Sequence, residues 1–90
     1  MSIAYLDGTY LPLEEARISP LDRGFLFGDG IYEVVPSYAG SMVGFAPHIA
    51  RMKSGLAAVG INLDWSETDW ADLCNRLITD NGAGNLGIYL

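Results

Sequence analysis

The chain has 90 residues, of which half are hydrophobic and 18% are charged, and its formal net charge is −6. Ninety residues make one small domain, and this apolar content is high for so small a core, which indicates that a further domain or a partner subunit covers part of the surface. The five basic residues are scattered along the sequence, so neither nucleic acid nor an anionic membrane surface is expected as a partner, because both need clustered cations.

The first third of the sequence predicts a hairpin followed by irregular chain. Two β-prone runs, Ile3–Leu6 and Thr9–Leu11, flank Asp7-Gly8, which is typical of a tight hairpin with a primed turn. A further short strand is expected between Glu14 and Ser19. The glycine-rich stretch from Ser19 to Gly30 predicts an irregular loop, and its aromatic residues favour a loop packed against the rest of the protein.

The middle of the sequence predicts a strand pair. Ile31–Tyr38 has strong β character, and Met42–Phe45 is expected to return beside it after a turn. Because side chains alternate along a strand, Tyr32 and Val34 share one face and Glu33 lies on the other. An acidic residue on such a face is ordinarily exposed to solvent.

Two amphipathic helices are expected next. The first contains Pro47 in its first turn and runs to about Val59, where Gly60 ends it. The second begins at Ser66, which forms a near capping box with Asp69. The apolar stripes at helical spacing are Ile49, Met52, Leu56 and Val59 in the first helix, and Trp70, Leu73, Cys74, Leu77 and Ile78 in the second.

The last segment, Leu86–Leu90, is expected to start a strand, and its apolar final residues indicate a strand cut in mid-run. The fold class predicted for residues 1–90 is therefore α+β: a single domain with an antiparallel sheet of about five or six strands and two helices packed on it.

Several features that the sequence lacks bear on where the protein is located and on which kinds of reactive site are expected. No hydrophobic run approaches the roughly 20 residues of a membrane span, and the first residues lack the basic region of a signal peptide. A soluble cytoplasmic protein is the default expectation. With one histidine and one cysteine, a zinc site within the chain is not expected, and Cys74 is interpreted as a buried structural thiol.

Arg51 is a candidate binding residue on chemical grounds alone. It lies beside the apolar stripe of the first helix, at the rim of a possible pocket, and its guanidinium suits a phosphate or carboxylate. A solvated surface arginine fits the same position. Tyr32 can likewise be a half-buried strand tyrosine, His48 a packing residue and Lys53 a solvated lysine. The residues alone thus indicate a small α+β domain with a possible anion site.

A longer sequence pattern favours one of these interpretations over the others. The stretch Leu21–Val35, which reads LDRGFLFGDGIYEVV, closely resembles the N-terminal motif of fold-type IV enzymes that use pyridoxal 5′-phosphate, and within them the D-amino-acid (D-alanine) aminotransferases. The likeness includes the hairpin Tyr5–Gly8, the His-x-x-Arg helix at His48–Met52 and the strand start Gly87–Leu90. It covers essentially all of the chain, as the N-terminal part of a two-domain enzyme.

This resemblance implies roles for named residues. The family's arginine that binds the cofactor phosphate matches Arg51, and its tyrosine that helps hold the substrate carboxylate matches Tyr32. Val34 falls where the family shapes the pocket for the substrate side chain. Glu33 matches an acidic residue near the site, and His48 belongs to the same helix motif as Arg51.

The resemblance also implies that this chain supplies only part of an active site. The Schiff-base lysine, the acid facing the pyridine nitrogen and the other carboxylate-binding residues follow later in such enzymes, so no catalytic residue and no metal ligand is assigned here. Lys53 cannot take that role, because side chains two residues apart on a helix point about 200° apart. The chain alone is expected to be inactive.

The complete enzyme implied by this family is a homodimer that moves an amino group between D-amino acids and 2-oxo acids. Three alternatives stay open: an aminodeoxychorismate lyase-like enzyme, an amine or branched-chain transaminase of the same fold, and a module that binds or assembles without catalysis.

Overall fold

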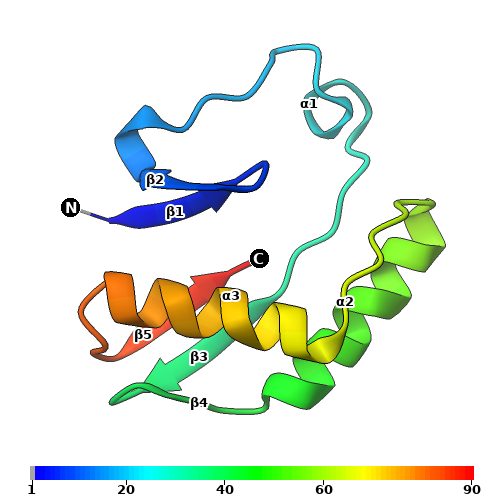
Figure 1. The fold of residues 1–90 in the computed structure, drawn as a ribbon. Coiled ribbons are helices and arrows are strands. Elements are labelled where there is room, and N and C mark those ends of the chain that lie inside the picture. The colour runs from blue at the N-terminus through cyan, green and yellow to red at the C-terminus, as the bar shows by residue number, and fades with distance from the viewer. Residues whose placement is uncertain (1) are drawn as a thin grey trace.

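The computed structural model describes residues 2–90. In chain order these residues form β1 (Ile3–Leu6), β2 (Thr9–Pro12), a 3₁₀ turn (Leu13–Glu15), α1 (Arg23–Phe27), β3 (Val34–Tyr38), β4 (Ser41–Met42), α2 (Phe45–Val59), α3 (Glu67–Asp80) and β5 (Leu86–Tyr89) (Figure 1).

The N-terminal hairpin is confirmed. β1 and β2 pair antiparallel, with Leu6 opposite Thr9, so the turn consists of Asp7 and Gly8. Both turn residues have positive φ angles, 49° and 85°, as a primed two-residue turn requires. Asp-Gly is a favoured pair for such a turn, because glycine carries no Cβ and aspartate tolerates the left-handed region.

β3 is the central strand of a second, three-stranded antiparallel sheet with the order β4-β3-β5. The predicted strand Ile31–Tyr38 is therefore present, but its regular part starts at Val34. Glu33 and Leu90 still exchange backbone hydrogen bonds of 2.9 and 2.8 Å, which extends the β3–β5 ladder by one pair. The return strand is shorter than expected, because Phe45 begins α2 directly after Gly44.

The α+β class and the two packed helices are confirmed. The five strands fall into two sheets, one of two strands and one of three, where the sequence predicted one sheet. α2 and α3 pack on the same face of the three-stranded sheet, so that Val35 and Ile88 contact Cys74 and Ile78 in a buried cluster. A second cluster joins α2 to α3 through Ile49, Met52, Trp70 and Leu73.

α2 ends, and α3 begins, as the sequence predicts. Gly60 has a φ of 76° at the end of α2, and the capping box at the start of α3 joins Ser66 and Asp69 by hydrogen bonds of 2.8 and 3.1 Å. The apolar stripes also lie inward, except that Val59 is exposed at the end of α2. Cys74 is fully buried, which confirms the predicted burial of its thiol.

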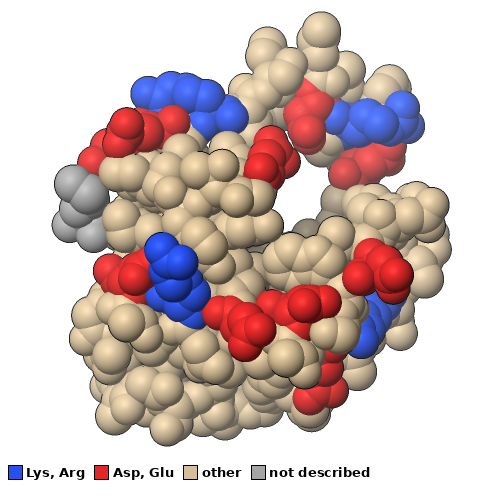
Figure 2. Space-filling model, viewed as in Figure 1, with Lys and Arg blue, Asp and Glu red and all other residues tan. Residues whose placement is uncertain are grey.

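The segment between the hairpin and β3 departs from prediction. Residues 14–19 form no strand, since the 3₁₀ turn ends at Glu15 and extended chain follows. The glycine-rich stretch contains the short helix α1, and its Phe25 and Phe27 side chains are 65% and 64% exposed. The expectation that these aromatic residues pack the loop against the rest of the protein is wrong. Figure 2 shows an open gap between this segment and the body of the molecule.

Candidate functional site

Glu33 lies at the start of the β3 ladder and points toward α2. Its neighbour Ile31 packs on Gly55 of α2, where a Cβ would lie 2.9 Å from the Ile31 Cδ1 atom. A glycine at this position therefore lets the chain approach the helix closely. The approach places the Glu33 carboxylate against α2, where it is only 8% exposed. The expectation of a solvent-exposed Glu33 is wrong, because α2 covers the face that strand alternation assigns to it.

Arg51 forms a two-point contact with this carboxylate. Its Nε donates to Glu33 Oε2 at 2.6 Å, and its Nη2 donates to Glu33 Oε1 at 2.7 Å. Such a paired contact fixes the plane of a guanidinium as well as its distance. The Arg51 side chain is nevertheless 70% exposed. Glu33 thus holds one edge of the guanidinium, and the Nη1 edge faces solvent.

His48 completes the cluster from the preceding turn of α2. Its Nδ1 lies 2.7 Å from Glu33 Oε1 and 3.4 Å from Arg51 Nη2. An ionised carboxylate can only accept hydrogen bonds, so the His48 Nδ1 carries the proton and donates to Glu33. Arg51 Nη2 is also a donor and therefore makes no hydrogen bond with His48. Glu33 thus accepts from both residues and orients both.

The hydrogen bonds that Glu33 accepts keep its carboxylate ionised at neutral pH and well into the acidic range. Hydrogen bonds from Arg51, and then from His48, lower the pKa of the Glu33 carboxyl from 4.5 to about 2. The same contact raises the pKa of the Arg51 guanidinium. Arg51 is therefore a permanently charged, oriented donor that can meet an anion with its free N–H groups.

Tyr32 and Val34 lie on the opposite face of the segment, as strand alternation predicts. Tyr32 is 66% exposed, and its ring stacks on that of Tyr89 in β5, with ring centroids 5.8 Å apart and an angle of 8° between the planes. Sequence reasoning did not single out Tyr89. No local sequence pattern identifies it, because the contact follows from the β3–β5 register: Tyr89 pairs with Val34, and Tyr32 is the diagonal neighbour of Tyr89.

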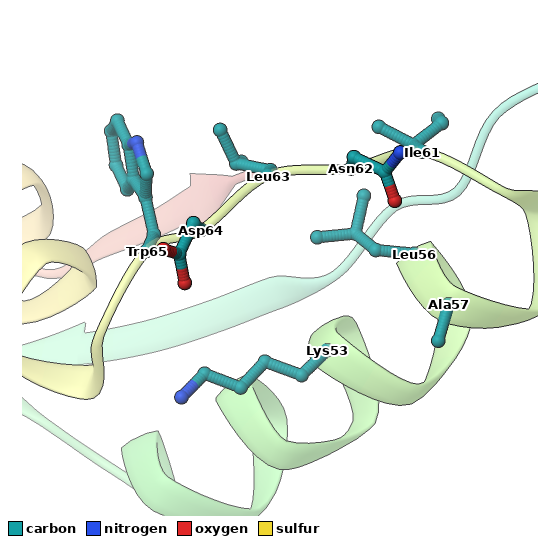
Figure 3. Close-up of a pocket in the computed structure, with 8 residues that line it drawn as sticks. All are labelled: Lys53, Leu56, Ala57, Ile61, Asn62, Leu63, Asp64 and Trp65. Carbon is teal, nitrogen blue, oxygen red and sulfur yellow. The ribbon is translucent and has the colours of Figure 1, made fainter.

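Two cavities of the described residues 2–90 lie away from Arg51, at whose side the sequence indicated a possible pocket. One cavity of about 460 Å³ lies between α2 and the 61–65 segment, with Lys53, Leu56 and Ala57 on its α2 side (Figure 3). A second, of about 910 Å³, lies between the β1–β2 hairpin and β5. Neither is lined by Arg51, Glu33, His48, Tyr32 or Val34. These five residues form an open surface, and Lys53 points to another side of α2, as helix geometry predicts.

Two further observations concern residues 2–90. These residues contain no group of three or more histidine, cysteine, aspartate or glutamate side chains arranged to hold a metal ion. Within the same range, no helix has the length and apolar character needed to cross a membrane. On the face shown in Figure 2 the basic side chains lie apart from one another, each near acidic ones.

The described residues form a small α+β unit in which an arginine is oriented beside a β-ladder, and comparison with known sequences identifies its family. The model of the family described as amino-transferase class IV matches residues 30–90, and this chain belongs to that family. The matched region begins at Gly30 and contains all five site residues, but not α1.

Several curated relatives carry the name D-alanine aminotransferase. The one from Staphylococcus epidermidis is 32% identical over 90 residues, which is all of this chain and 32% of the relative. That from Bacillus licheniformis is 34% identical over 84 residues, covering 93% of this chain and 30% of the relative. The chain thus spans about a third of the length of the curated relatives it matches.

Proposed function

We propose that this chain is the part of a D-amino-acid aminotransferase that grips the phosphate of pyridoxal 5′-phosphate and helps to orient the substrate. The observation that carries the proposal is the two-point contact between Glu33 and Arg51. Family membership supports the reaction class, and the names of the relatives support D-alanine as the type of substrate.

The donor set suits a phosphate monoester. Arg51 is held by Glu33 on its Nε and Nη2 atoms and exposes its Nη1 edge, so an anion can bind without reorganising the side chain. Glu33 compensates one positive charge, and the remaining attraction for a phosphate is therefore directional rather than long-ranged. We assign Glu33 and His48 as positioning residues, which act on the cofactor through Arg51.

Tyr32 and Val34 are proposed to contact the substrate. The exposed phenol of Tyr32 is held by stacking on Tyr89, which leaves its hydroxyl free to donate to a carboxylate. Val34 is 43% exposed on the same face, and this exposure supports its proposed contact with a small substrate side chain. In this proposal, the Glu33 face of the 32–34 segment serves the cofactor phosphate through Arg51, and the opposite face, with Tyr32 and Val34, contacts the substrate.

Pyridoxal 5′-phosphate, when bound, supplies the electron sink for amino-group transfer, and this chain supplies binding and orientation. The single lysine, Lys53, lies beside the smaller cavity and away from Arg51, so the proton-transferring residue is proposed to lie in a part of the enzyme outside this chain. We also propose that the complete enzyme is a homodimer, since the exposed aromatic side chains of α1 need a covering partner.

The cofactor contact is tested with the 90-residue chain and pyridoxine 5′-phosphate. This compound lacks the aldehyde, so it cannot react with Lys53, and pyridoxine without the phosphate is the matched control compound. At roughly millimolar concentrations, NMR is expected to show shifts of the Arg51 side-chain Nε–H and of the amides of residues 32–34. Pyridoxine should leave these signals in place.

The matched control variant is Arg76→Ala. Arg76 is also an exposed arginine paired through Nε with a carboxylate, Asp80, at 2.8 Å, but it lies on α3. Arg51→Ala should abolish the phosphate-dependent shifts, and Arg76→Ala should preserve them. Equal binding by Arg51→Ala and the unaltered chain would contradict the proposed phosphate contact.

The reaction is tested in a joined protein, in which this chain replaces the matched third of the S. epidermidis relative. The joined protein is expected to transfer the amino group of D-alanine, and not of L-alanine, to a 2-oxo acid. The unaltered relative serves as the positive control. A folded joined protein that acts on L-alanine alone, or that eliminates rather than transfers, would overturn the substrate assignment.

A further inference from the structure

Asn81 directly follows α3 and joins the N-terminal hairpin to the end of that helix, beside which β1 lies (Figure 1). Its Oδ1 atom accepts from the Ile3 N–H at 2.9 Å, and its Nδ2 atom donates to the Ile3 carbonyl at 3.0 Å. The same Nδ2 atom donates to the Leu77 carbonyl at 2.8 Å. One primary amide therefore satisfies two backbone groups of β1 and one of α3, across 78 residues of sequence.

The residue after Asn81 makes this amide reactive. Asparagine is thermolabile, because the backbone nitrogen of the next residue can attack its side-chain amide carbon. Glycine hinders this attack least, because it carries no Cβ. Asn81 is followed by Gly82, which is exposed to water, whereas the other three asparagines precede leucine or arginine. Asn81 is thus the asparagine of this chain whose neighbour allows the reaction best.

In the folded chain both reacting groups are held by hydrogen bonds. The Gly82 N–H donates to the Thr79 carbonyl at 3.3 Å, and the Ala83 N–H donates to the Ile78 carbonyl at 2.8 Å. With a φ of 91° at Gly82, these two bonds form a Schellman motif at the end of α3. The attack requires the Gly82 nitrogen to lose its proton and the Asn81 amide to turn toward it. Both sets of hydrogen bonds must therefore open first.

We propose that Asn81 is a deamidation site, and that its conversion weakens the attachment of the β1–β2 hairpin to α3. The Gly82 nitrogen forms a bond to Asn81 Cγ, the bond from Cγ to Nδ2 breaks, and ammonia leaves with the proton of the Gly82 N–H. Water then opens the cyclic imide at either carbonyl carbon, which gives aspartate or its β-linked isomer at this position. No oxidant or reductant takes part.

The product cannot make the contacts of the amide. A carboxylate accepts hydrogen bonds and donates none. Its second oxygen would take the place of Nδ2, which lies within 3.0 Å of the Ile3 and Leu77 carbonyl oxygens. Both carbonyls lose their donor and meet a negative charge at a part-buried position, which is unfavourable. Because ammonia is lost, the weakened attachment persists once it has formed.

Two aromatic contacts also hold the hairpin to the helical side of the molecule. The Arg76 guanidinium of α3 lies over the Tyr10 ring, 4.2 Å from its centroid, and the Tyr5 ring meets that of Trp65 with centroids 6.0 Å apart. A change that weakens either contact should open the Asn81 site more often. The rate of deamidation therefore measures how often the hairpin leaves α3.

The site is tested by incubating the 90-residue chain at neutral pH, with and without guanidinium chloride, and mapping converted residues by peptide mass spectrometry. We expect Asn81 to convert roughly tenfold or more slowly in the folded chain, because only the open fraction reacts. Equal rates in both conditions overturn the proposed protection. In denaturant, Gly82→Ala should slow the conversion strongly, since a Cβ hinders the attack and folding plays no part there. No conversion of Asn81 in denaturant overturns the site itself.

The link to the hairpin is tested with Tyr10→Leu, which removes the contact with Arg76. In the folded chain this variant should convert Asn81 several times faster than the unaltered chain. Tyr38→Leu is the matched control, since Tyr38 is an exposed tyrosine of β3. It should leave the rate unchanged. Equal rates in the two variants overturn the dependence on the hairpin.

The consequence is tested with Asn81→Asp, in which hydrogen exchange of the Ile3 amide should be about tenfold faster, since the anchor of β1 is weakened. Asn85→Asp is the matched control. Asn85 Oδ1 accepts from the Ala39 N–H at 3.1 Å, and a carboxylate keeps this role. The control should leave Ile3 exchange unchanged.

A second measurement needs no variant, in case Asn81→Asp does not fold. A partly converted sample of the unaltered chain contains both forms, and NMR follows the Ile3 amide of each form in one tube. Faster exchange in the converted form supports the proposal. Equal exchange in both forms overturns the effect on the hairpin.

Discussion

Glu33 and Arg51 are joined by two hydrogen bonds of 2.6 and 2.7 Å across 18 residues of sequence, although Arg51 is largely exposed to solvent. The buried partner is the carboxylate, and the exposed partner is the cation. This arrangement fixes the direction of a positive group at the surface, and it makes the local stability of the site depend on the ionisation of Glu33.

Glu33→Gln is expected to reduce the acid sensitivity of the fold. The pKa of Glu33 is about 2 in the folded chain and 4.5 ordinarily, so its stabilisation is complete above pH 4.5 and is lost as the pH falls through about 2. The variant should be less stable at neutral pH and should lose less stability between these two values. Urea unfolding at a series of pH values measures both effects.

Asp69→Asn provides the comparison for this experiment. Asp69 also has a lowered pKa, caused first by its hydrogen bond from the Ser66 backbone and then by the Ser66 side chain. It therefore contributes acid sensitivity at a separate place. The two variants should have additive effects, since they share no partner. A pH profile of Glu33→Gln identical to that of the unaltered chain would show that Arg51 does not hold Glu33 in solution.

Gly55 and Ile31 are predicted to be coupled. Alanine is favoured over glycine in a helix by about 1 kcal/mol, but a Cβ at Gly55 would lie 2.9 Å from Ile31 Cδ1. The two effects should leave Gly55→Ala near neutral. In the background Ile31→Ala, which lacks both Cδ1 and the Cγ2 atom that would lie 3.3 Å away, the same change should stabilise by about 0.5–1 kcal/mol. A double-mutant cycle of urea unfolding measures the difference, and additive changes would refute the contact.

Tyr32→Phe is predicted to affect substrate binding alone. The phenyl ring keeps the stacking on Tyr89, and the lost hydroxyl should raise the KM for D-alanine about tenfold in the joined protein. Tyr38→Phe is the matched control, because Tyr38 is 58% exposed on the same face of β3. Its KM should stay at the starting value, and so should the cofactor affinity of both variants. A tenfold rise in both would point to the strand rather than to the hydroxyl.

The elements that depend on neighbouring residues were predicted well. The turn at Asp7-Gly8 and the cap at Ser66 follow from a few adjacent residues, and the α3 stripe follows from helical spacing. Interactions between residues that are close in the sequence determine these features, so the sequence pattern alone is enough to predict them. The faces of Tyr32 and Glu33 were predicted for the same reason, since alternation along a strand is local.

What covers each face could not be predicted in this way. Glu33 is buried because Gly55 admits the 31–33 segment close to α2, and that contact joins residues more than 20 positions apart. The stacking of Tyr32 on Tyr89 depends on the β3–β5 register, which no local pattern specifies. Phe25 and Phe27 are apolar residues whose exposure depends on what packs against α1, and local sequence does not contain that information.

Cys74 provides a measure of how tightly α3 packs on the three-stranded sheet. Its side chain is fully buried between Val35 and Ile88, and burial raises the pKa of its thiol to about 11. The thiolate is the reactive form, so a disulfide reagent at pH 8 should label Cys74 at least a hundredfold more slowly than an exposed cysteine.

The exposed reference is Ser54→Cys in a Cys74→Ala background, since Ser54 lies on the open side of α2. Labelling of Cys74 should accelerate with urea in proportion to the unfolded fraction, because the thiol becomes accessible only when α3 leaves the sheet. Rapid labelling without urea would mean that α3 separates from β3 and β5 in the folded chain.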